Sequence, residues 1–360
     1  MVKKRICCVI PSLVLGGMER VMSTLATYFA DEKNQEVFLV LFGLKREIKY
    51  SISEKIVVVK PNFEFDNSKR TLCTIKTMLW LRKTIKQIDP DTILSFGEYW
   101  NNFVLLSLLG TKYPVYVSDR SKPDLNIGTF QNFLREKLYS KSAGIICQTE
   151  KAYYIMKKRL KHNNIVIIGN PIRNIKSKRY ENRQNVVLSV GRLIDTKNFD
   201  RLISIFSKIN KSGWKLVIVG GDALKQKNLQ KLQSMIDSMG MTDKIFLEGY
   251  KTNVDDYLSN SKIFAFTSSS EGFPNVIGEA MSAGLPVISY DCMAGPSDMI
   301  DDGKNGYLVP LYEDDTFIEK LSLLMNDEKK IMEMGNDAEI KIKDFSRENI
   351  CQKFYDFITC

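Results

Sequence analysis

Two glutamates, Glu271 and Glu279, lie eight residues apart, directly after a predicted strand. Pro274 and Gly284 stand where a helix begins and ends, so the sequence predicts a short helix over 276–283. The free N–H groups and the dipole of its first turn would form an anion site. Taken alone, a pair of glutamates is also compatible with a solvated loop residue and a surface helix residue.

Two cations, Arg192 and Lys197, follow the first strand of the second half of the chain, within the segment GRLIDTKN. A glycine turn would place both at the end of that strand. An arginine fork and a lysine point charge together suit a diphosphate. A solvated basic loop is the alternative interpretation. The strand–glycine–helix pattern recurs at Gly220 and Gly221, which is a weak signal because such turns use glycine for backbone reasons.

In the first half of the chain, Gly16 and Gly17 lie between a predicted strand and a predicted helix. They do not form the GxGxxG dinucleotide fingerprint, and no acidic residue follows the next strand to bind a ribose, so a nicotinamide dehydrogenase is disfavoured. GxxxxGK[ST] is also absent from the sequence, which disfavours phosphoryl transfer of the P-loop type. The glycine loop suits a substrate that approaches the backbone.

Strands of four to eight residues alternate with helical segments, which predicts parallel βαβ units. The pattern pauses over a polar segment and then restarts. We therefore predict an α/β chain with two doubly wound Rossmann-like domains that face each other across a cleft. The expected ranges are 1–170 for the first domain, 171–185 for a linker, 186–345 for the second domain, and 346–360 for a helix that packs back toward the first. Ligands of such folds bind outside the carboxyl ends of the strands.

The segment SEGFPNVIGEAMSAGLPVIS, together with GRLIDTKN, GGMERV and GPSDMIDDGKNGYLVP, resembles the retaining family 4 glycosyltransferases of GT-B fold. The likeness covers nearly the whole chain in the right order, and the glutamate pair is its most specific part. By this resemblance, Arg192 and Lys197 hold the diphosphate of a nucleotide-sugar donor and Glu279 binds the donor ribose. Glu271 holds the transferred sugar.

The resemblance also implies further contacts with the donor. The backbone before and at the start of the predicted helix, which is that of Gly272, Phe273, Pro274, Asn275 and Val276, would hold the sugar and the phosphates through its amides, although Pro274 itself has no N–H. Gly16 and Gly17 would approach the diphosphate from the first domain. Tyr250 and Lys251 are weaker candidates for contact with the base.

One departure from the family pattern concerns histidine. Many family members carry a histidine in the first domain that contacts the donor sugar, whereas the only histidine here, His162, lies in a basic stretch where we expect it to be solvated. Asp119 or Arg120 is the candidate substitute, and Glu98 at the preceding strand end is a third. Each is equally compatible with a helix cap or a salt bridge.

We expect no metal and no other cofactor, because the sequence has no DxD triplet at a strand end. The resemblance implies that the anomeric configuration is retained by front-face attack, with the leaving phosphate taking the acceptor proton. No covalent nucleophile is then needed, and Glu271 is not given that role.

The charge of the chain is unevenly distributed. Its net charge is +10, but residues 1–180 hold 31 Lys and Arg against 15 Asp and Glu, while residues 181–360 hold 21 against 27. The range 69–87 has six basic residues and no acidic one, and its apolar residues Leu72, Ile75, Leu79 and Trp80 are expected to pack on the sheet. The range 151–179 has nine basic residues and no acidic one. This charge suits an anionic membrane or a phosphate-bearing lipid acceptor, and no nucleic-acid motif accompanies it.

Seven scattered cysteines without a CxxC pair indicate a reducing cytosol. Neither a signal peptide nor a membrane-spanning segment is predicted from the sequence. We therefore expect a cytoplasmic protein, peripheral on the inner face of the cell membrane.

The expected activity is transfer of a hexose or N-acetylhexosamine from a nucleotide-diphosphate sugar, with UDP as the favoured nucleotide. The acceptor would be lipid-linked or a saccharide, in bacterial surface polysaccharide assembly such as capsule or lipopolysaccharide. Two alternatives stay open at this point. One is a GT-B nucleotide-sugar epimerase, and the other is an inactive nucleotide-sugar-binding subunit of a polysaccharide complex.

Overall fold

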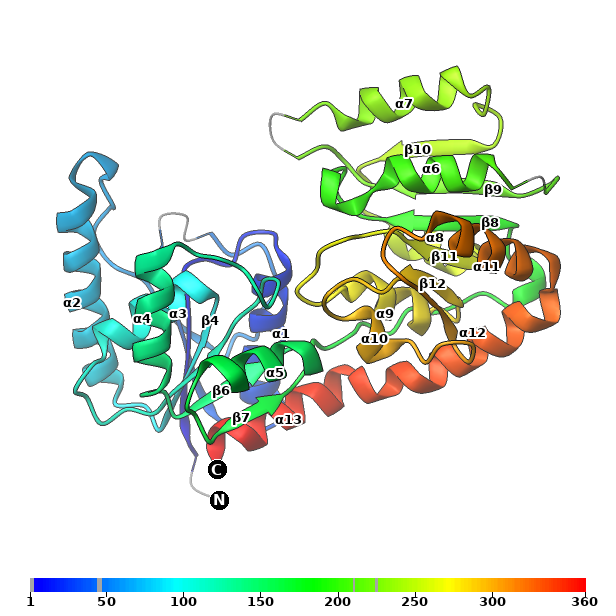
Figure 1. Cartoon of the computed structure of the whole chain (residues 1–360). Helices are drawn as coiled ribbons and strands as arrows, with labels where there is room; N and C mark the ends of the chain where they lie inside the picture. The colour runs from blue at the N-terminus through cyan, green and yellow to red at the C-terminus, as the bar shows by residue number, and fades with distance from the viewer. Residues whose placement is uncertain (1–2, 44–46, 210, 224–225) are drawn as a thin grey trace. The chain divides into compact units, whose positions relative to one another are not determined.

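The computed structural model describes residues 3–43, 47–209, 211–223 and 226–360. The chain divides into two compact units. Unit 1 comprises Met1–Pro171 and Arg347–Cys360, and unit 2 comprises Ile172–Ser346. In Figure 1, unit 1 runs from blue to the green of Pro171 and also includes the red residues from Arg347 on, whereas the green residues after 171 belong to unit 2.

Unit 1 is built on a seven-stranded parallel sheet with the order β3-β2-β1-β4-β5-β6-β7. Its inner strands are continuous apolar runs, as expected for a sheet that is covered on both faces. The strands are β1 (Arg5–Ile10), β2 (Glu36–Leu41), β3 (Val57–Val59), β4 (Thr92–Phe96), β5 (Val115–Ser118), β6 (Gly144–Cys147) and β7 (Ile165–Ile167).

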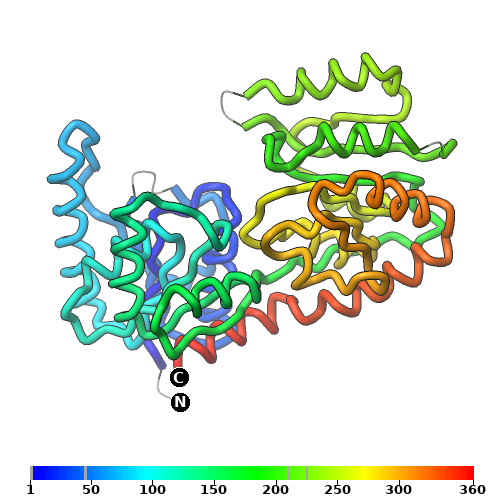
Figure 2. The backbone as a smooth tube through the Cα atoms, in the orientation of Figure 1, coloured from blue at the N-terminus to red at the C-terminus, as the bar shows by residue number. Residues whose placement is uncertain are grey.

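Helices cover the unit 1 sheet, and one of them comes from the end of the chain. They are α1 (Gly17–Asp31), α2 (Arg70–Ile88), α3 (Glu98–Ser107), α4 (Thr129–Tyr139), α5 (Glu150–Arg159) and α13 (Arg347–Thr359). The last helix contacts α1 and β4, and its Phe354 ring lies 6.1 Å from the ring of Phe96. Figure 2 shows this red segment beside the blue and green trace of unit 1.

Unit 2 has a six-stranded parallel sheet with the order β10-β9-β8-β11-β12-β13. Its strands are β8 (Val186–Val190), β9 (Lys215–Val219), β10 (Ile245–Gly249), β11 (Ile263–Phe266), β12 (Val287–Tyr290) and β13 (Gly306–Val309). Its helices are α6 (Phe199–Ser207), α7 (Asn228–Ser238), α8 (Val254–Asn260), α9 (Asn275–Ser282), α10 (Pro296–Met299), α11 (Asp314–Asn326) and α12 (Glu328–Ile342).

Both sheets reverse their strand order at one point, between β1 and β4 in unit 1 and between β8 and β11 in unit 2. The predicted pair of doubly wound Rossmann-like units is confirmed. At each reversal the loops after the two strands leave in opposite directions, which opens a space for a ligand at the carboxyl ends. These loops carry several of the predicted site residues.

The segment expected to be a linker belongs to unit 2. Ile172 and Ile175 are buried in the core cluster that contains α9, and the amide of Ile172 donates a hydrogen bond to the carbonyl oxygen of Phe345 (2.8 Å). The boundary between the units therefore falls at Pro171. The polar composition hid these two apolar anchors, because they are isolated in sequence.

The face that α2 buries differs from the predicted one. Leu72, Ile75 and Leu79 are exposed, and only Trp80 of the expected apolar residues packs against the core. The helix turns the opposite face inward, with Cys73, Thr77, Leu81, Thr84, Ile85 and Ile88. Threonine fits this face because its hydroxyl bonds within the helix, as Thr77 does to the carbonyl oxygen of Cys73 (2.7 Å). Across the described residues, no helix is long and apolar enough to cross a membrane.

Candidate functional site

Lys197 and Glu271 meet at the strand reversal of unit 2. Lys197 lies in the loop after β8 and Glu271 in the loop after β11, and the lysine ammonium forms an ion pair with Oε1 of the carboxylate. Both side chains are largely buried, at 16% and 14% exposure. The ammonium also lies over the ring of Phe266, 5.1 Å from its centroid. The pair is thus a fixed charge site and not a pair of solvated surface groups.

Hydrogen bonds between the two loops hold this pair in place. The carbonyl oxygen of Thr196 accepts from the amide of Ser269 (2.8 Å) and from the hydroxyl of Ser268 (3.1 Å). In return, the hydroxyl of Thr267 donates to the carbonyl oxygen of Lys197 (2.9 Å). The serine run before Glu271 therefore has a structural role that its sequence alone did not indicate.

Arg192 is exposed in the turn after β8, and this turn packs directly against the turn after β9. A Cβ atom on Gly220 would lie 1.7 Å from the carbonyl oxygen of Gly191, so glycine is required at position 220. The next glycine, Gly221, lies beside Tyr250, whose side chain is 73% exposed. The predicted contacts Arg192 and Tyr250 thus lie at the same edge of the unit 2 sheet.

Lys251, the other candidate for the base, forms an ion pair with Glu248 (3.0 Å). The hydroxyl of Tyr257 donates to the same carboxylate (2.8 Å) and lowers the pKa of Glu248, with Lys251 adding to the effect. Lys251 is therefore tied to β10, whereas Tyr250 beside it is open to a ligand.

Glu279 is buried in α9, and its partner is a residue that the sequence did not indicate. The Nε of Arg173 donates to Oε1 of Glu279 (3.2 Å), and the same guanidinium pairs with Asp255 at the start of α8 (3.0 Å). Arg173 lies 106 residues before Glu279, so no local spacing links them. The contact fixes Glu279 between α9 and the segment that enters unit 2.

Side chains around the first turn of α9 pack into the core of unit 2. Helix α9 begins at Asn275, one residue before the predicted start, with Pro274 as its cap. The ring of Phe273 is buried 5.8 Å from the ring of Phe345, and Val276 is half-buried against the same core. Gly272, which precedes this turn, is half-buried.

In unit 1 the glycine loop is held by Tyr50. The amide of Gly16 donates to the Tyr50 hydroxyl (2.9 Å), which in turn donates to the carbonyl oxygen of Gly16 (2.7 Å). A Cβ atom on Gly16 would lie 2.2 Å from the carboxylate of Glu19. Burial raises the pKa of Glu19. Gly17 is exposed and begins α1.

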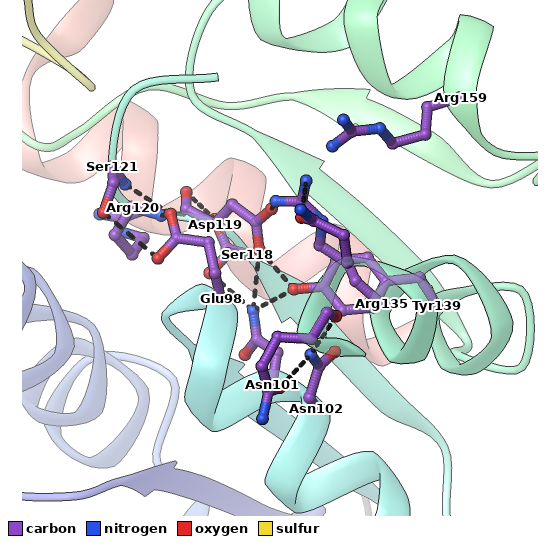
Figure 3. A network of polar contacts seen from close by, with 12 residues as sticks. Glu98, Asn101, Asn102, Ser118, Asp119, Arg120, Ser121, Arg135, Tyr139 and Arg159 are labelled. Carbon is purple, nitrogen blue, oxygen red and sulfur yellow. Dashed lines mark hydrogen bonds and ion pairs between the residues drawn. The ribbon is translucent and has the colours of Figure 1, made fainter. Parts of the chain in front are cut away.

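Glu98 begins α3 at the strand reversal of unit 1, and its carboxylate is used within the protein. Its Oε1 accepts from the amides of Arg120 (3.0 Å) and Ser121 (2.7 Å), as Figure 3 shows. Glu98 is buried. It therefore holds the loop after β5 instead of projecting into solvent.

Asp119 is enclosed in the same network (Figure 3). Its carboxylate accepts from Asn101 Nδ2 (3.2 Å), from Arg135 Nη1 (3.4 Å) and from the hydroxyl of Tyr139. Burial raises the pKa of Asp119 to about 7, and the nearby charge of Glu98 adds to this effect. All three donors belong to unit 1, so the carboxylate is already hydrogen-bonded within that unit.

Arg120 has a different environment. Its guanidinium lies 4.2 Å over the ring of Phe96, and Nη2 donates to Oδ1 of Asn170 (2.6 Å). Burial lowers its pKa to about 9. Among the described residues, its Nε has no hydrogen-bond partner. Nη1 donates to the hydroxyl of Ser118 (3.3 Å), so most of the guanidinium is held within unit 1.

His162 was expected to be solvated, but its side chain is half-buried and hydrogen-bonded. Its Nε2 lies 3.0 Å from the carbonyl oxygen of Ser142, and its Nδ1 lies 3.0 Å from the amide of Asn164. The residue therefore joins the turn between α4 and β6 to the loop before β7.

Two Rossmann-like units, each with a doubly wound parallel sheet, are the architecture of the GT-B fold class. Two family models match: Glycosyltransferase Family 4 over residues 15–173, and Glycosyl transferases group 1 over residues 171–341. The chain therefore belongs to the family 4 glycosyltransferases.

Curated relatives match over nearly their whole length. An amylovoran biosynthesis glycosyltransferase of Erwinia amylovora is 29% identical, with 95% of this chain and 96% of the relative covered. An alpha-1,4-N-acetyl-D-galactosaminyltransferase of Campylobacter jejuni, whose name includes a PP-undecaprenol-linked saccharide, is 27% identical with 98% of each covered.

Solved structures show the same fold. The lipopolysaccharide outer core galactosyltransferase WaaB has a TM-score of 0.80 at 20% identity, with 98% of this chain and 99% of that chain covered. HepE of Anabaena, in complex with UDP, has a TM-score of 0.82 at 16% identity, with 98% of both chains covered.

Proposed function

We propose that this chain is a retaining glycosyltransferase that moves a hexose or N-acetylhexosamine from a UDP-sugar to a lipid-linked or saccharide acceptor in surface polysaccharide biosynthesis. The observation that carries the proposal is the buried pair of Lys197 and Glu271 at the strand reversal of unit 2. A cation fixed there can meet a leaving diphosphate, while the adjacent carboxylate can accept sugar hydroxyls.

In the proposed reaction, the bond between the anomeric carbon and the UDP oxygen breaks as negative charge grows on the leaving phosphate. Lys197, Arg192 and the first turn of α9 stabilise that charge. The acceptor hydroxyl attacks from the same face and gives its proton to the leaving phosphate oxygen. No side chain forms a covalent bond, and the proposed role of Glu279 is to hold the donor ribose.

The acceptor and the location are proposed on different grounds. A relative that matches over the full length is named for a PP-undecaprenol-linked saccharide, which supports a lipid-linked acceptor for this chain. The basic charge of residues 1–180 supports a peripheral position on the inner face of the cell membrane. We assign the acceptor to unit 1 because the proposed donor site, with Lys197 and Glu271, lies in unit 2.

The test combines a donor screen with product analysis. Purified protein is exposed to a panel of nucleotide sugars, and the shift in melting temperature identifies the donor. Transfer is then measured with an undecaprenyl-diphosphate saccharide, with and without EDTA, and NMR gives the anomeric configuration. We expect one UDP-sugar to stabilise the protein, and an α-linked product from an α-linked donor, unaffected by EDTA. Inversion or EDTA sensitivity would contradict the proposal, and epimer formation without acceptor would point to an epimerase.

A further inference from the structure

Helix α2 carries three large apolar side chains in solvent. Leu72, Ile75 and Leu79 are 64%, 50% and 64% exposed. Their spacing of three and four residues places them on one stripe of the helix, and this stripe is opposite the face that packs on unit 1. A helix that already buries one face thus presents a second apolar surface that none of the described residues of unit 1 covers.

Positive charge accompanies this stripe. Lys83 and Lys86 continue the same line toward the end of α2, and Lys76 lies beside its middle; all three are exposed. The range 69–87 contains no acidic residue. The stripe therefore combines an apolar half with a basic half, which is the composition of a helix that lies in a membrane interface.

The surroundings leave the stripe accessible within unit 1. Residues 66–72 are all exposed, and Figure 1 shows the first turns of α2 extending past α3 and α4. Near its other end, Arg82 donates to the carbonyl oxygen of Leu109 (2.8 Å), which brings α3 alongside. Leu106 and Leu109, at and just after the end of α3, are exposed as well.

We propose that α2 binds an anionic lipid bilayer by inserting Leu72, Ile75 and Leu79 among the acyl chains, while Lys76, Lys83 and Lys86 contact lipid phosphates. Charge complementarity identifies this occupant. In a symmetric dimer with parallel α2 helices, the same lysines of both copies would face each other, and like charges repel; with antiparallel helices, Lys83 and Lys86 would lie against the apolar half of the other copy without a counter-charge. An anionic bilayer satisfies both halves of the stripe. The inference deepens the proposed function and rests on its membrane location, but its test measures binding and not transfer.

The test uses vesicle flotation with the full chain and with Leu72→Ser/Ile75→Ser/Leu79→Ser. The matched control is Leu323→Ser/Met332→Ser/Ile340→Ser, which removes three exposed apolar side chains from unit 2. With phosphatidylcholine vesicles that contain phosphatidylglycerol, we expect the α2 variant to lose vesicle affinity by about tenfold or more and the control to bind like the wild type. Unchanged melting temperature and donor-induced shift in the α2 variant show that its loss is not misfolding.

A second variant separates insertion from adsorption. The emission that Leu79→Trp adds to that of the three native tryptophans, taken as the difference from the wild type, should be quenched by lipids brominated on their acyl chains, whereas the emission that Ile340→Trp adds should not be. Three outcomes overturn the proposal: a wild-type chain that does not float, an α2 variant that floats as well as the control, or a Leu79→Trp signal that brominated chains do not quench. A wild-type dimer that the α2 variant converts to monomer, without a change in flotation, would assign the stripe to a second copy instead.

Discussion

At the scale of single residues, Asp119 illustrates how burial changes the role of a carboxylate. Three side chains donate to it, and burial raises its pKa to about 7. The folded protein therefore keeps the carboxyl protonated over a range in which the unfolded chain has already lost the proton. We expect Asp119 to support the loop after β5 and to leave Arg120 as the group that meets a ligand.

The raised pKa gives a signed prediction for stability. The stabilisation from protonated Asp119 is fully present below the ordinary pKa of 3.8 and is lost as the pH rises through about 7. Asp119→Asn should remove up to about 1.4 kcal/mol per pH unit from the slope of the unfolding free energy in that window. Urea unfolding at several pH values measures the slope. Asp124→Asn, an exposed carboxylate nearby, is the control, and parallel curves for wild type and Asp119→Asn would contradict the prediction.

Arg173 tests whether Glu279 needs its partner. Arg173→Ala would leave a buried carboxylate without its cation, so we expect the KM for the UDP-sugar to rise by about tenfold with a smaller change in kcat. Arg173→Lys should restore part of the affinity. Steady-state kinetics give both constants, and Arg179→Ala, an exposed arginine of the same segment, is the control. Equal KM values for Arg173→Ala and Arg179→Ala would rule out the positioning role.

The sequence could indicate only some of these residues. Lys197 and Glu271 were predicted because each belongs to a recognisable segment after a strand. Arg173 and Tyr50 were missed, since each meets its partner only through the fold. Burial of the Glu98 carboxylate was likewise not predictable, because its partners are amides of a loop 22 and 23 residues away.

At the scale of elements, the strand–helix alternation predicted both sheets, because parallel strands buried on two faces give continuous apolar runs. The face of α2 was predicted wrongly. The prediction placed leucine and isoleucine on the buried face, yet Thr77 and Thr84 are buried instead, and the Thr77 hydroxyl bonds to the helix backbone. Apolar periodicity cannot distinguish a core face from a face that binds a membrane.

The close packing of the turns after β8 and β9 gives a prediction at this scale. Gly220→Ala would place a Cβ atom 1.7 Å from the carbonyl oxygen of Gly191, so the turn that carries Arg192 must shift. Gly213→Ala is the matched control, since Gly213 has a positive φ but open space around it. This variant should lower the free energy of unfolding by about 1–2 kcal/mol. Gly220→Ala should lower the free energy of unfolding by more than this, as urea unfolding can show, and should also weaken UDP binding, as calorimetry can show. Equal losses of unfolding free energy in both variants would contradict this account.

At the scale of the whole molecule, charge is divided along the chain, with an excess of 16 positive charges in residues 1–180 and of six negative charges in residues 181–360. Salt screens exposed charges more than largely buried ones. Raising the salt concentration should therefore lower vesicle affinity far more than it lowers UDP affinity, because the Lys197 and Glu271 side chains are largely buried. Flotation measures the vesicle affinity and calorimetry the UDP affinity across a salt series. Equal losses of both affinities would contradict this division of charge between the two halves of the chain.

The central claim is that Lys197 stabilises the leaving diphosphate at the strand reversal of unit 2. The most direct test is kcat/KM for transfer from the donor that the screen identifies, measured for the wild type, Lys197→Met and Lys329→Met. Lys329 is 83% exposed on α12 and serves as the matched lysine. We predict a loss of about 10²–10³-fold for Lys197→Met and a change within about twofold for Lys329→Met. Wild-type kcat/KM in correctly folded Lys197→Met would contradict the claim.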